Sequence, residues 1–333
     1  MSQTSNDFAL RCTAYGNPPE IHVIEGVSET PLGSGEVRLA IDCSAFNFTD
    51  HLLVQGRYQE KPELPFTPGF DAAGTVTAVG DQVTGFAPGD RVVSSGVCGA
   101  WATHLVAPAH RLVKIPAGLA PADAVASINS HLTAYHGLID RAQLAAGDRV
   151  LVLGANGAVG KACVQIARHQ GAHVFTVVRA GTALNITDTA TDTCLSVAPE
   201  ALKDGLRQVL GKQGADIVVD PVGDLYTEPA VRNLAWRGRL LVIGFAAGQI
   251  PKIPTNLLLL KGASVMGVYC GGLLIQETGQ FTRQMAEMFD LMAQGILTPS
   301  AHETWPGRQF ADIWERFSSA PRGTKVLLGF RAP

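Results

Sequence analysis

Apolar positions between residues 149 and 179 follow two different spacings, and together they predict one βαβ unit. Residues 150–153 and 174–178 are short, nearly continuous apolar runs, as in buried strands. Between them, apolar residues recur at the period of one helix face, at Val159, Ala162, Cys163, Ile166 and Ala167. Gly171 is predicted to end this helix. A strand, a helix and a second strand form the minimum element of a doubly wound dinucleotide-binding sheet.

A glycine-rich turn joins the first apolar run to the helix. Residues 154–160 read Gly-Ala-Asn-Gly-Ala-Val-Gly. Aligned with the fingerprint G-x-G-x-x-G, Ala155 replaces the first glycine while Gly157 and Gly160 match the others, so we expect a slightly wider turn. Small residues bring backbone N–H groups close to a pyrophosphate, and the helix N-terminus adds partial positive charge. The pattern favours cofactor binding over the alternative, a structural turn without a ligand.

The first 125 residues have the pattern of a β-rich region. Residues 37–43 alternate between apolar and polar or small positions, which predicts a half-buried strand. Further strands are expected at residues 74–79 and 91–94, separated by glycine and proline turns. Strands at this spacing without intervening helices indicate a small barrel-like unit.

The second region returns to alternating strands and helices. Residues 215–220 and 239–244 are continuous apolar runs, as expected for parallel strands covered on both faces. Residues 263–269 are a candidate last strand. A methionine-rich helix at 281–294, interpreted as core packing, a helix near 310–317 and a closing strand at 325–328 follow. We expect this tail to pack on the first region. The predicted division is a β-rich domain at 1–127, a Rossmann domain at 128–268 and a return to the first domain at 269–333.

Composition limits the classes of partner. Of 333 residues, 46% are hydrophobic and 17% charged, and the net charge is −3, without a basic run. These values predict a compact enzyme-like chain and argue against a nucleic-acid partner. No apolar run reaches the length of a membrane span or a signal peptide. The six cysteines are too far apart in sequence to form a metal knuckle or a redox pair. Scattered free thiols are typical of proteins in a reducing compartment, so we expect this protein in the cytoplasm.

Several stretches carry a resemblance to a known family. They are residues 47–50, 55–58, 61–66, 68–74, 152–160, 220–223, 242–251 and 257–261. In this order, over almost the whole chain, they resemble the zinc-independent quinone oxidoreductases of the medium-chain dehydrogenase/reductase superfamily, relatives of zeta-crystallin. The resemblance implies an α/β fold in which a Rossmann domain, with its doubly wound parallel sheet, interrupts a GroES-like catalytic domain.

The residues at the zinc positions of this superfamily predict that no metal is bound. Asn47 stands where zinc alcohol dehydrogenases have a cysteine ligand, and residues 69–71 read Gly-Phe-Asp in place of Gly-His-Glu. Asparagine and phenylalanine cannot replace a thiolate and an imidazole, and Asp71 alone cannot hold a tetrahedral zinc. The four-cysteine structural lobe is also missing, since only Cys98 lies in that neighbourhood.

The resemblance also implies the site residues. Asn47, Tyr58 and Thr133 would be catalytic, with a turn cap, a surface-packed tyrosine and a buried helix threonine as their respective structural alternatives. Cofactor contacts would fall on Asn156, Gly157, Ala158, Val159, Gly160, Arg179, Val222, Gly244, Phe245 and Ala246. Leu52 stands where the family has a second tyrosine, which predicts a more apolar pocket.

Arg179 indicates which cofactor is used. An acidic residue at the end of the second strand would bind the ribose hydroxyls of NAD, but this chain has Arg179 there. An arginine can bind the 2′-phosphate in bidentate fashion, so NADPH is favoured over NADH. The family's lysine and tyrosine beyond this strand have no counterparts in residues 180–197, so Arg179 either binds the phosphate nearly alone or is a solvated strand-end charge.

The predicted activity is metal-free reduction of a quinone, or of a similar electron-poor conjugated carbonyl, by NADPH. A quinone accepts a hydride without a Lewis acid because its developing oxyanion is delocalised. No strong general acid is expected beside Asn47, which suits quinones better than enones. The alternatives are reduction of the C=C bond of an enone, enal or enoyl thioester, and a non-catalytic, crystallin-like cofactor-binding protein.

Residues 263–269 also predict the assembly. A last strand in a parallel sheet leaves unpaired N–H and C=O groups along its outer edge. Pairing with a two-fold mate would satisfy them, and the resemblance implies a homodimer of this kind. The alternative is a monomer with a covered edge.

Overall fold

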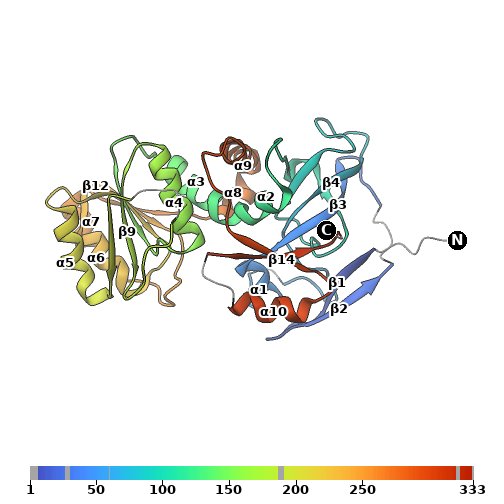
Figure 1. The fold of residues 1–333 in the computed structure, drawn as a ribbon, viewed down its shortest axis with the longest axis horizontal. Helices are drawn as coiled ribbons and strands as arrows, with labels where there is room; N and C mark the ends of the chain where they lie inside the picture. The colour runs from blue at the N-terminus through green and yellow to red at the C-terminus, as the bar shows by residue number, and fades with distance from the viewer. Residues whose placement is uncertain (1–6, 27–30, 60, 187–190, 320–322, 332–333) are drawn as a thin grey trace. The chain divides into compact units, whose positions relative to one another are not determined.

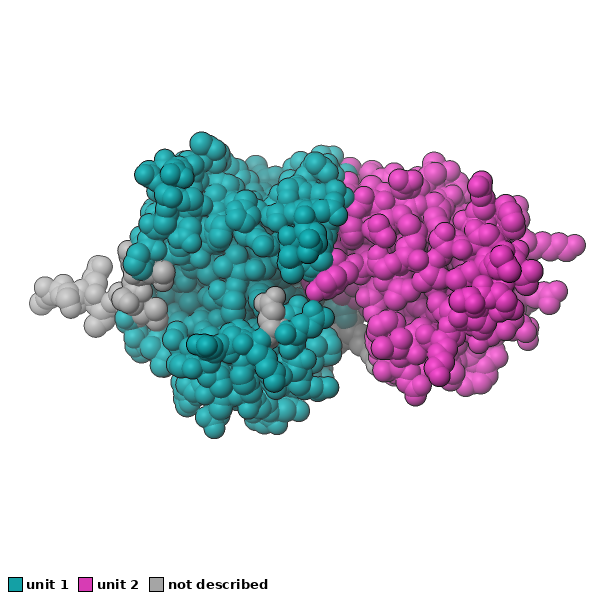
Figure 2. All heavy atoms as spheres, turned by 180° about the vertical axis from the view of Figure 1, so that it is seen from behind, with its two compact units in different colours: residues 1–128, 271–295, 299–333 teal, residues 129–270, 296–298 magenta. Residues whose placement is uncertain are grey.

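The computed structural model describes residues 7–26, 31–59, 61–186, 191–319 and 323–331. They divide into two compact units, coloured separately in Figure 2. Unit 1 lies within Met1–Ile128, Gly271–Gly295 and Pro299–Pro333, and unit 2 within Asn129–Cys270 and Ile296–Thr298. No helix in the described ranges combines the length and apolar character that crossing a membrane requires.

Unit 2 is built on a six-stranded parallel sheet (Figure 1). Its strands are β8 (Arg149–Leu153), β9 (His173–Arg179), β10 (Thr193–Val197), β11 (Ala215–Asp220), β12 (Leu234–Val242) and β13 (Ser264–Gly267). The strand order is β10-β9-β8-β11-β12-β13, so the order reverses between β8 and β11. This is the doubly wound arrangement of a Rossmann sheet, and it confirms the predicted fold class.

Helices accompany the strands of unit 2. They are α4 (Ala158–His169), α5 (Pro199–Leu210), η4 (Asp224–Tyr226), α6 (Thr227–Arg232) and α7 (Thr255–Lys261). In the apolar face predicted for α4, Ala162, Cys163, Ile166 and Ala167 are buried and Val159 is partly buried. Residues 121–141 form four joined helical segments, namely α2 (Pro121–Ser127), η2 (Ile128–Leu132), α3 (Thr133–Tyr135) and η3 (His136–Arg141), of which η2 and η3 are π-helical.

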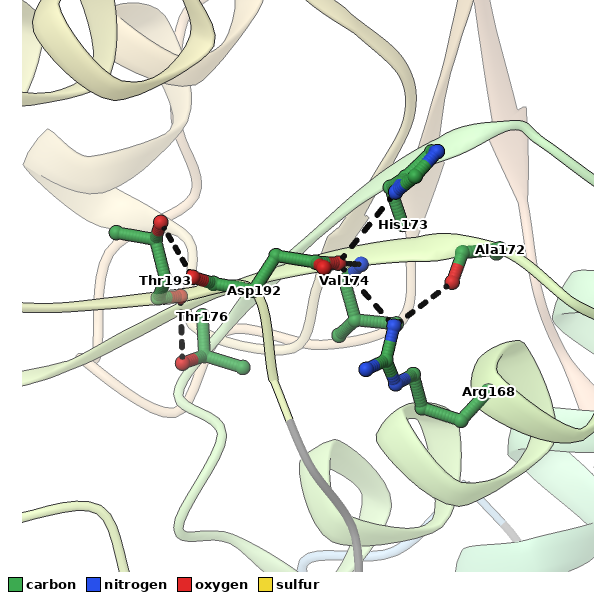
Figure 3. A network of polar contacts seen from close by, with 7 residues as sticks. All are labelled: Arg168, Ala172, His173, Val174, Thr176, Asp192 and Thr193. Carbon is green, nitrogen blue, oxygen red and sulfur yellow. Dashed lines mark hydrogen bonds and ion pairs between the residues drawn. The ribbon is translucent and has the colours of Figure 1, made fainter.

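β10 was not predicted from the sequence, and a polar network holds it against β9 (Figure 3). Asp192, directly before β10, accepts hydrogen bonds from the backbone N–H of Val174 (2.5 Å) and from Arg168 Nη1 (3.2 Å). The backbone N–H of Asp192 in turn donates to the carbonyl of Val174 (2.8 Å). These bonds tie the start of β10 to the start of β9 and to the end of α4.

Unit 1 contains a seven-stranded sheet and a separate hairpin. The sheet strands are β3 (Glu36–Phe46), β4 (Asp71–Val79), β5 (Arg91–Ser95), β6 (His104–Pro108), β7 (Leu112–Lys114), β14 (His302–Pro306) and β15 (Lys325–Gly329). Their order is β14-β15-β3-β4-β5-β7, with β6 also paired to β3. The hairpin is β1 (Phe8–Ala14) with β2 (Glu20–Glu25).

The C-terminal tail completes this sheet. β15 pairs antiparallel with β3, with Val326 opposite Phe46. The helices of unit 1 include α1 (Phe48–Val54), η1 (Ala109–Arg111), α9 (Thr278–Ala293) and α10 (Phe310–Ser319). Helix α8 (Cys270–Gln276) begins at Cys270, where the first segment of unit 2 ends. The predicted methionine stripe of α9 is buried, so its interpretation as core packing is confirmed.

Candidate active site

Asn47 lies at the junction of β3 and α1, and buried hydrogen bonds fix this junction. The side chain of Asp50, in the first turn of α1, accepts the backbone N–H of Asn47 at Oδ2 (2.8 Å). Its Oδ1 accepts the backbone N–H of Phe70 (3.2 Å), directly before β4. Asp50 therefore satisfies an N–H group at the helix start and ties α1 to the neighbouring strand. Asn47 itself is only 4% exposed.

Both ends of the Asn47 amide are engaged. Its Nδ2 donates to Asp71 Oδ2 (2.8 Å), and its Oδ1 accepts from Lys325 Nζ (3.1 Å). A carboxylate can accept only and an ammonium can donate only, so these partners define the orientation of the amide. Ser95 supports the arrangement from β5, since its hydroxyl donates to Asp71 Oδ1 (2.6 Å). One N–H and one oxygen lone pair of the amide remain for another partner.

The cluster formed by Asn47, Asp50, Asp71, Ser95 and Lys325 holds two carboxyl groups and one ammonium. Burial, assisted by the charge of Asp71, raises the pKa of Asp50 to about 8. Burial also raises the pKa of Asp71, against the hydrogen bond from Ser95 and the charge of Lys325. Burial lowers the pKa of Lys325, and the charges of Asp71 and Asp50 oppose this change. Burial therefore destabilises the charged form of each of these three groups, and the protonation state of each group depends on the charges of the other two.

The structure places beside Asn47 an ammonium group that the sequence did not indicate, that of Lys325. Lys325 comes from the closing strand, 278 residues further along the chain. The antiparallel register that sets Val326 opposite Phe46 brings the preceding residue, Lys325, to the level of Asn47. Asp71 was considered only as a possible metal ligand, although it binds the Asn47 amide. The strand prediction at residues 325–328 was the available signal, but it does not give the pairing partner.

Tyr58 lies in the same unit as Asn47, and Thr133 lies in unit 2. The Tyr58 ring packs 6.0 Å from the ring of Phe70, whose backbone is bound to Asp50. Thr133 is 9% exposed; its hydroxyl donates to the carbonyl of Asn129 (2.6 Å), and its side chain hydrogen-bonds the Cys270 thiol. The catalytic roles of both residues stay predictions.

The turn between β8 and α4 has the features that a pyrophosphate requires. Gly157 is the N-cap of α4, its position offers no side-chain cap, and no acidic residue lies in the first turn. The first N–H groups of the helix are therefore available to an anion. A Cβ atom on Gly160 would lie 2.5 Å from the carbonyl oxygen of Gly154, so this close turn needs glycine. Ala158 and Val159 form the first turn of the helix and provide two of these N–H groups.

The loops after β11 and β12 bring the other predicted cofactor residues together. Asp220 Oδ1 accepts the backbone N–H groups of Val222 (2.9 Å) and Gly223 (2.8 Å). The backbone N–H of Ala246 donates to the carbonyl of Pro221 (3.1 Å), so Gly244, Phe245 and Ala246 lie against this loop. Val222 also lies beside the glycine turn, because a Cβ atom on Gly154 would be 2.8 Å from its Cγ2. These loops lie at the carboxyl ends of the strands around the order reversal, where open α/β sheets bind ligands.

Arg179 and Asn156 lie on the opposite side of the glycine turn from Val222. Arg179 ends β9 and is exposed, and its guanidinium has no ion-pair or hydrogen-bond partner among the described residues. The side chain of Asn156 donates to the carbonyl of Ala183 (2.8 Å) and accepts the N–H of Asn185 (2.7 Å). Asn156 therefore holds the loop that follows Arg179, and its backbone is the part open to a ligand. The unpartnered guanidinium and the uncapped helix fit a phosphorylated dinucleotide.

The described residues contain no group of three or more His, Cys, Asp or Glu side chains arranged to hold a metal ion. At the positions compared with zinc ligands, Asp71 is bound to Asn47 and Ser95.

Comparison with known proteins agrees with this architecture. Residues 33–117 match the family described as "Alcohol dehydrogenase GroES-like domain", and residues 158–294 match "Zinc-binding dehydrogenase". The chain is 31% identical to quinone oxidoreductase-like protein 2 of Rattus norvegicus, over 99% of this chain and 94% of the relative. It is 28% identical to the quinone oxidoreductase of Homo sapiens, over 96% and 97%.

Solved structures show the same likeness. A mycobacterial protein determined in complex with NADPH superimposes with a TM-score of 0.83 at 27% identity, covering 97% of this chain and 100% of that one. Sequence and fold thus agree over nearly the full length. The chain belongs to the quinone oxidoreductase-like members of the medium-chain dehydrogenase/reductase superfamily, which are NAD(P)H-dependent oxidoreductases acting on small molecules.

Proposed function

We propose that this protein is an NADPH-dependent reductase of quinones or similar electron-poor conjugated carbonyls, and that it works without a metal. The observation that carries the proposal is the amide of Asn47, which is held by Asp71 and Lys325 at the position of a superfamily zinc ligand. An oriented amide can hydrogen-bond an acceptor oxygen, but it cannot bind zinc as a thiolate does.

Unit 2 would bind the cofactor. The free N–H groups at the start of α4 suit the pyrophosphate, and the unpartnered Arg179 suits a 2′-phosphate. The mycobacterial relative determined with NADPH supports the same choice. When bound, NADPH supplies a hydride. Val222, Gly244, Phe245 and Ala246 would line the cofactor, and Thr133 would orient the nicotinamide.

Unit 1 would bind the acceptor. The remaining N–H of Asn47 can donate to a carbonyl oxygen, and the partly buried Tyr58 can cover the acceptor. The contribution of Asn47 is orientation, together with stabilisation of the negative charge that develops on this oxygen.

A second candidate is reduction of the C=C bond of an enone, enal or enoyl thioester. The observation that favours it is the ammonium of Lys325, 3.1 Å from Asn47 Oδ1. Reduction of an enone gives an enolate, which needs a proton more than a delocalised hydroquinone anion does. A positioned acid is therefore of greater use to this reaction.

NADPH oxidation against matched panels of quinones and acyclic enones, before and after treatment with a chelator, tests the proposal. We expect turnover of at least one class, unchanged after chelation, and no stoichiometric zinc in elemental analysis. About one zinc per chain, or activity lost with the metal, would contradict metal-free catalysis. Normal NADPH binding with no turnover of either panel would favour a non-catalytic, crystallin-like protein.

The remaining parts of the proposal concern assembly and location. The outer edge of β13 and the exposed leucines of α7 suit pairing with a second copy, so we propose a homodimer. All six cysteines are free thiols, which suits a reducing cytoplasm. The net charge of −3 gives no reason to expect nucleic acid as a partner.

A further inference from the structure

Lys325 holds the Asn47 amide, and its ammonium has donors beyond that one hydrogen bond. It begins β15, and its side chain is partly buried, so it is neither a solvated surface lysine nor sealed in the core. Among the described residues, Asn47 Oδ1 is the only hydrogen-bond acceptor of the Lys325 ammonium. An ammonium carries three N–H donors, so two remain for a ligand or solvent.

The surroundings of Lys325 would help it release a proton. Burial lowers its pKa, while the charges of Asp71 on β4 and Asp50 on α1 keep it from falling further. The other titratable neighbour is His302, opposite Lys325 in the register with β14, and its Nε2 lies 3.1 Å from Asp123. A desolvated lysine is a stronger acid than a solvated one, and the nearby carboxyl groups stabilise the ammonium until the proton leaves.

Lys325 and Asn47 differ in what their side chains can do for a bound acceptor. The amide of Asn47 can hold an acceptor oxygen but has no proton that it can give up. The ammonium 3.1 Å from the amide oxygen can give one up. A carbonyl oxygen bound to the free Asn47 N–H would lie within a few ångströms of Nζ, roughly the reach of a direct or water-mediated hydrogen bond.

We propose that Lys325 is the proton donor that completes reduction in this protein, an inference that rests on the proposed reductase function. Hydride addition to a conjugated acceptor leaves an enolate or hydroquinone anion and oxidised cofactor. An N–H bond of Lys325 then breaks, its proton forms an O–H bond on the anion, and Nζ becomes a neutral amine that solvent reprotonates. A hydroquinone is complete at this point, whereas the enol formed from an enone tautomerises to the saturated carbonyl with no net change in protons. The acceptor gains one hydride and one proton, which balances its two-electron reduction.

This role extends the acceptor class to acyclic α,β-unsaturated carbonyls. Their enolates are more basic than hydroquinone anions, so their reduction depends more strongly on a positioned acid. Quinones remain substrates, but water can protonate their products. The dependence on Lys325 should therefore differ between the two classes.

The test compares kcat for one quinone and one acyclic enone, from neutral to alkaline pH, in wild type and in Lys325→Arg. Arginine keeps the positive charge beside Asp71 and Asp50 but does not release a proton in this range. We expect enone kcat to fall by about 100-fold or more and quinone kcat by less than about tenfold. The alkaline decline of enone kcat should be present in wild type and absent in the variant, with unchanged NADPH affinity.

Two further variants complete the design. Tyr58→Phe tests the rival donor: its enone kcat should keep the alkaline decline of wild type, even where loss of the hydroxyl changes the KM for the acceptor that Tyr58 covers. Lys114→Met is the matched control, because Lys114 is a strand lysine of the same unit whose ammonium pairs with Asp90 (2.9 Å), and it should behave as wild type. If Lys325→Arg does not fold, Lys325→Met with a retained melting temperature takes its place, with the same expected loss of enone turnover.

Different results would contradict the reductase function and the role of Lys325 as proton donor. Wild-type protein that binds NADPH but reduces no acceptor contradicts the reductase function. Wild-type protein that reduces enones, while Lys325→Arg does so at the same rate and with the same alkaline decline, overturns Lys325 as the donor. Loss of enone turnover in Tyr58→Phe and not in Lys325→Arg would assign the proton to Tyr58.

Discussion

At the residue scale, the amide of Asn47 makes two hydrogen bonds and keeps one N–H and one oxygen lone pair free for another partner. Asp71 and Lys325 hold it from opposite ends, so its remaining N–H points in one direction. Binding groups that need no reorientation stabilise a transition state at little entropic cost. A side chain held by two hydrogen bonds can therefore orient a bound acceptor better than a mobile side chain can.

Asn47→Ala tests that interpretation. Loss of one transition-state hydrogen bond, worth about 1.5 to 3 kcal/mol, should lower quinone turnover by roughly tenfold or more. NADPH affinity should not change, because the residues proposed to bind the cofactor lie in unit 2. Steady-state kinetics and a fluorescence titration of NADPH separate the two effects. Unchanged turnover of every acceptor with normal NADPH binding would make Asn47 a structural residue.

Arg179→Ala tests the choice of cofactor. Because the guanidinium has no partner among the described residues, its loss should leave the fold unaffected. The KM for NADPH should rise much more than the KM for NADH, since only NADPH carries the 2′-phosphate. Arg207→Ala, on the exposed side of α5, is a suitable control. Equal effects of Arg179→Ala on both cofactors would show that Arg179 is a solvated charge.

Asp50 gives a prediction for stability against pH. Its pKa is raised from 3.8 to about 8, so the folded state binds a proton that the unfolded state releases above 3.8. The free energy of unfolding should therefore fall as the pH rises across this window, relative to a variant without the carboxyl group. One pKa unit corresponds to about 1.4 kcal/mol, so a difference above about 1 kcal/mol should be measurable.

Denaturant unfolding of wild type and Asp50→Asn, near each end of this window, provides the measurement. Asp50→Asn retains one acceptor oxygen for the N–H of Asn47 or Phe70 but does not titrate. We expect wild type to lose stability relative to the variant towards the alkaline end. A constant difference between the two proteins would mean that Asp50 stays ionised throughout.

At the element scale, the junction of β9 and β10 depends on a side chain outside both strands. Asp192 accepts the N–H of Val174 and a guanidinium N–H of Arg168, as Figure 3 shows. Five residues of β10 then pair with β9 in parallel, and the last pair is Val197 with Arg179. The network lies at the start of β9, and the residue proposed to bind phosphate lies at its end.

Asp192→Ala should detach the start of β10. Removing the acceptor leaves the Val174 N–H and Arg168 without this partner, at a cost of about 1 to 2 kcal/mol for a carboxylate that is one-third exposed. The midpoint of thermal unfolding should fall, and amide exchange in β10 should accelerate. Asp192→Asn retains an acceptor oxygen and should lose less. Equal stability of all three proteins would contradict the anchoring role.

Strand β10 shows which kind of strand the apolar pattern of the sequence does not predict. β8, β9, β11 and β12 were predicted because strands covered on both faces are apolar throughout. β10 is an edge strand in which exposed and partly buried positions alternate, and its Thr and Ser residues give no apolar run. The glycine turn was predicted from a local motif, and Asn47 from the family resemblance. Lys325 was not predicted, because its place beside Asn47 arises from the pairing of β15 with β3.

At the scale of the whole molecule, the outer edge of unit 2 has the character of an interface. β13 pairs with β12 on one side, and the sheet ends there among the described residues. Nearby apolar side chains are exposed, including Leu259 at 80%, Leu260 at 72% and Val265 at 41%. An open strand edge beside exposed leucines is a site at which chains associate.

Pairing of β13 with a two-fold copy would extend the sheet and cover these leucines, so we expect a dimer. Light scattering at micromolar concentration should give about twice the chain mass of 35.1 kDa. Leu260→Lys should produce monomers without loss of folding, because the side chain is already exposed and the charge would oppose burial. Leu225→Lys, on η4 and 63% exposed, is the matched control and should remain dimeric. A wild-type protein of single-chain mass would refute the dimer, and a dimer that survives Leu260→Lys would mean that another surface forms it.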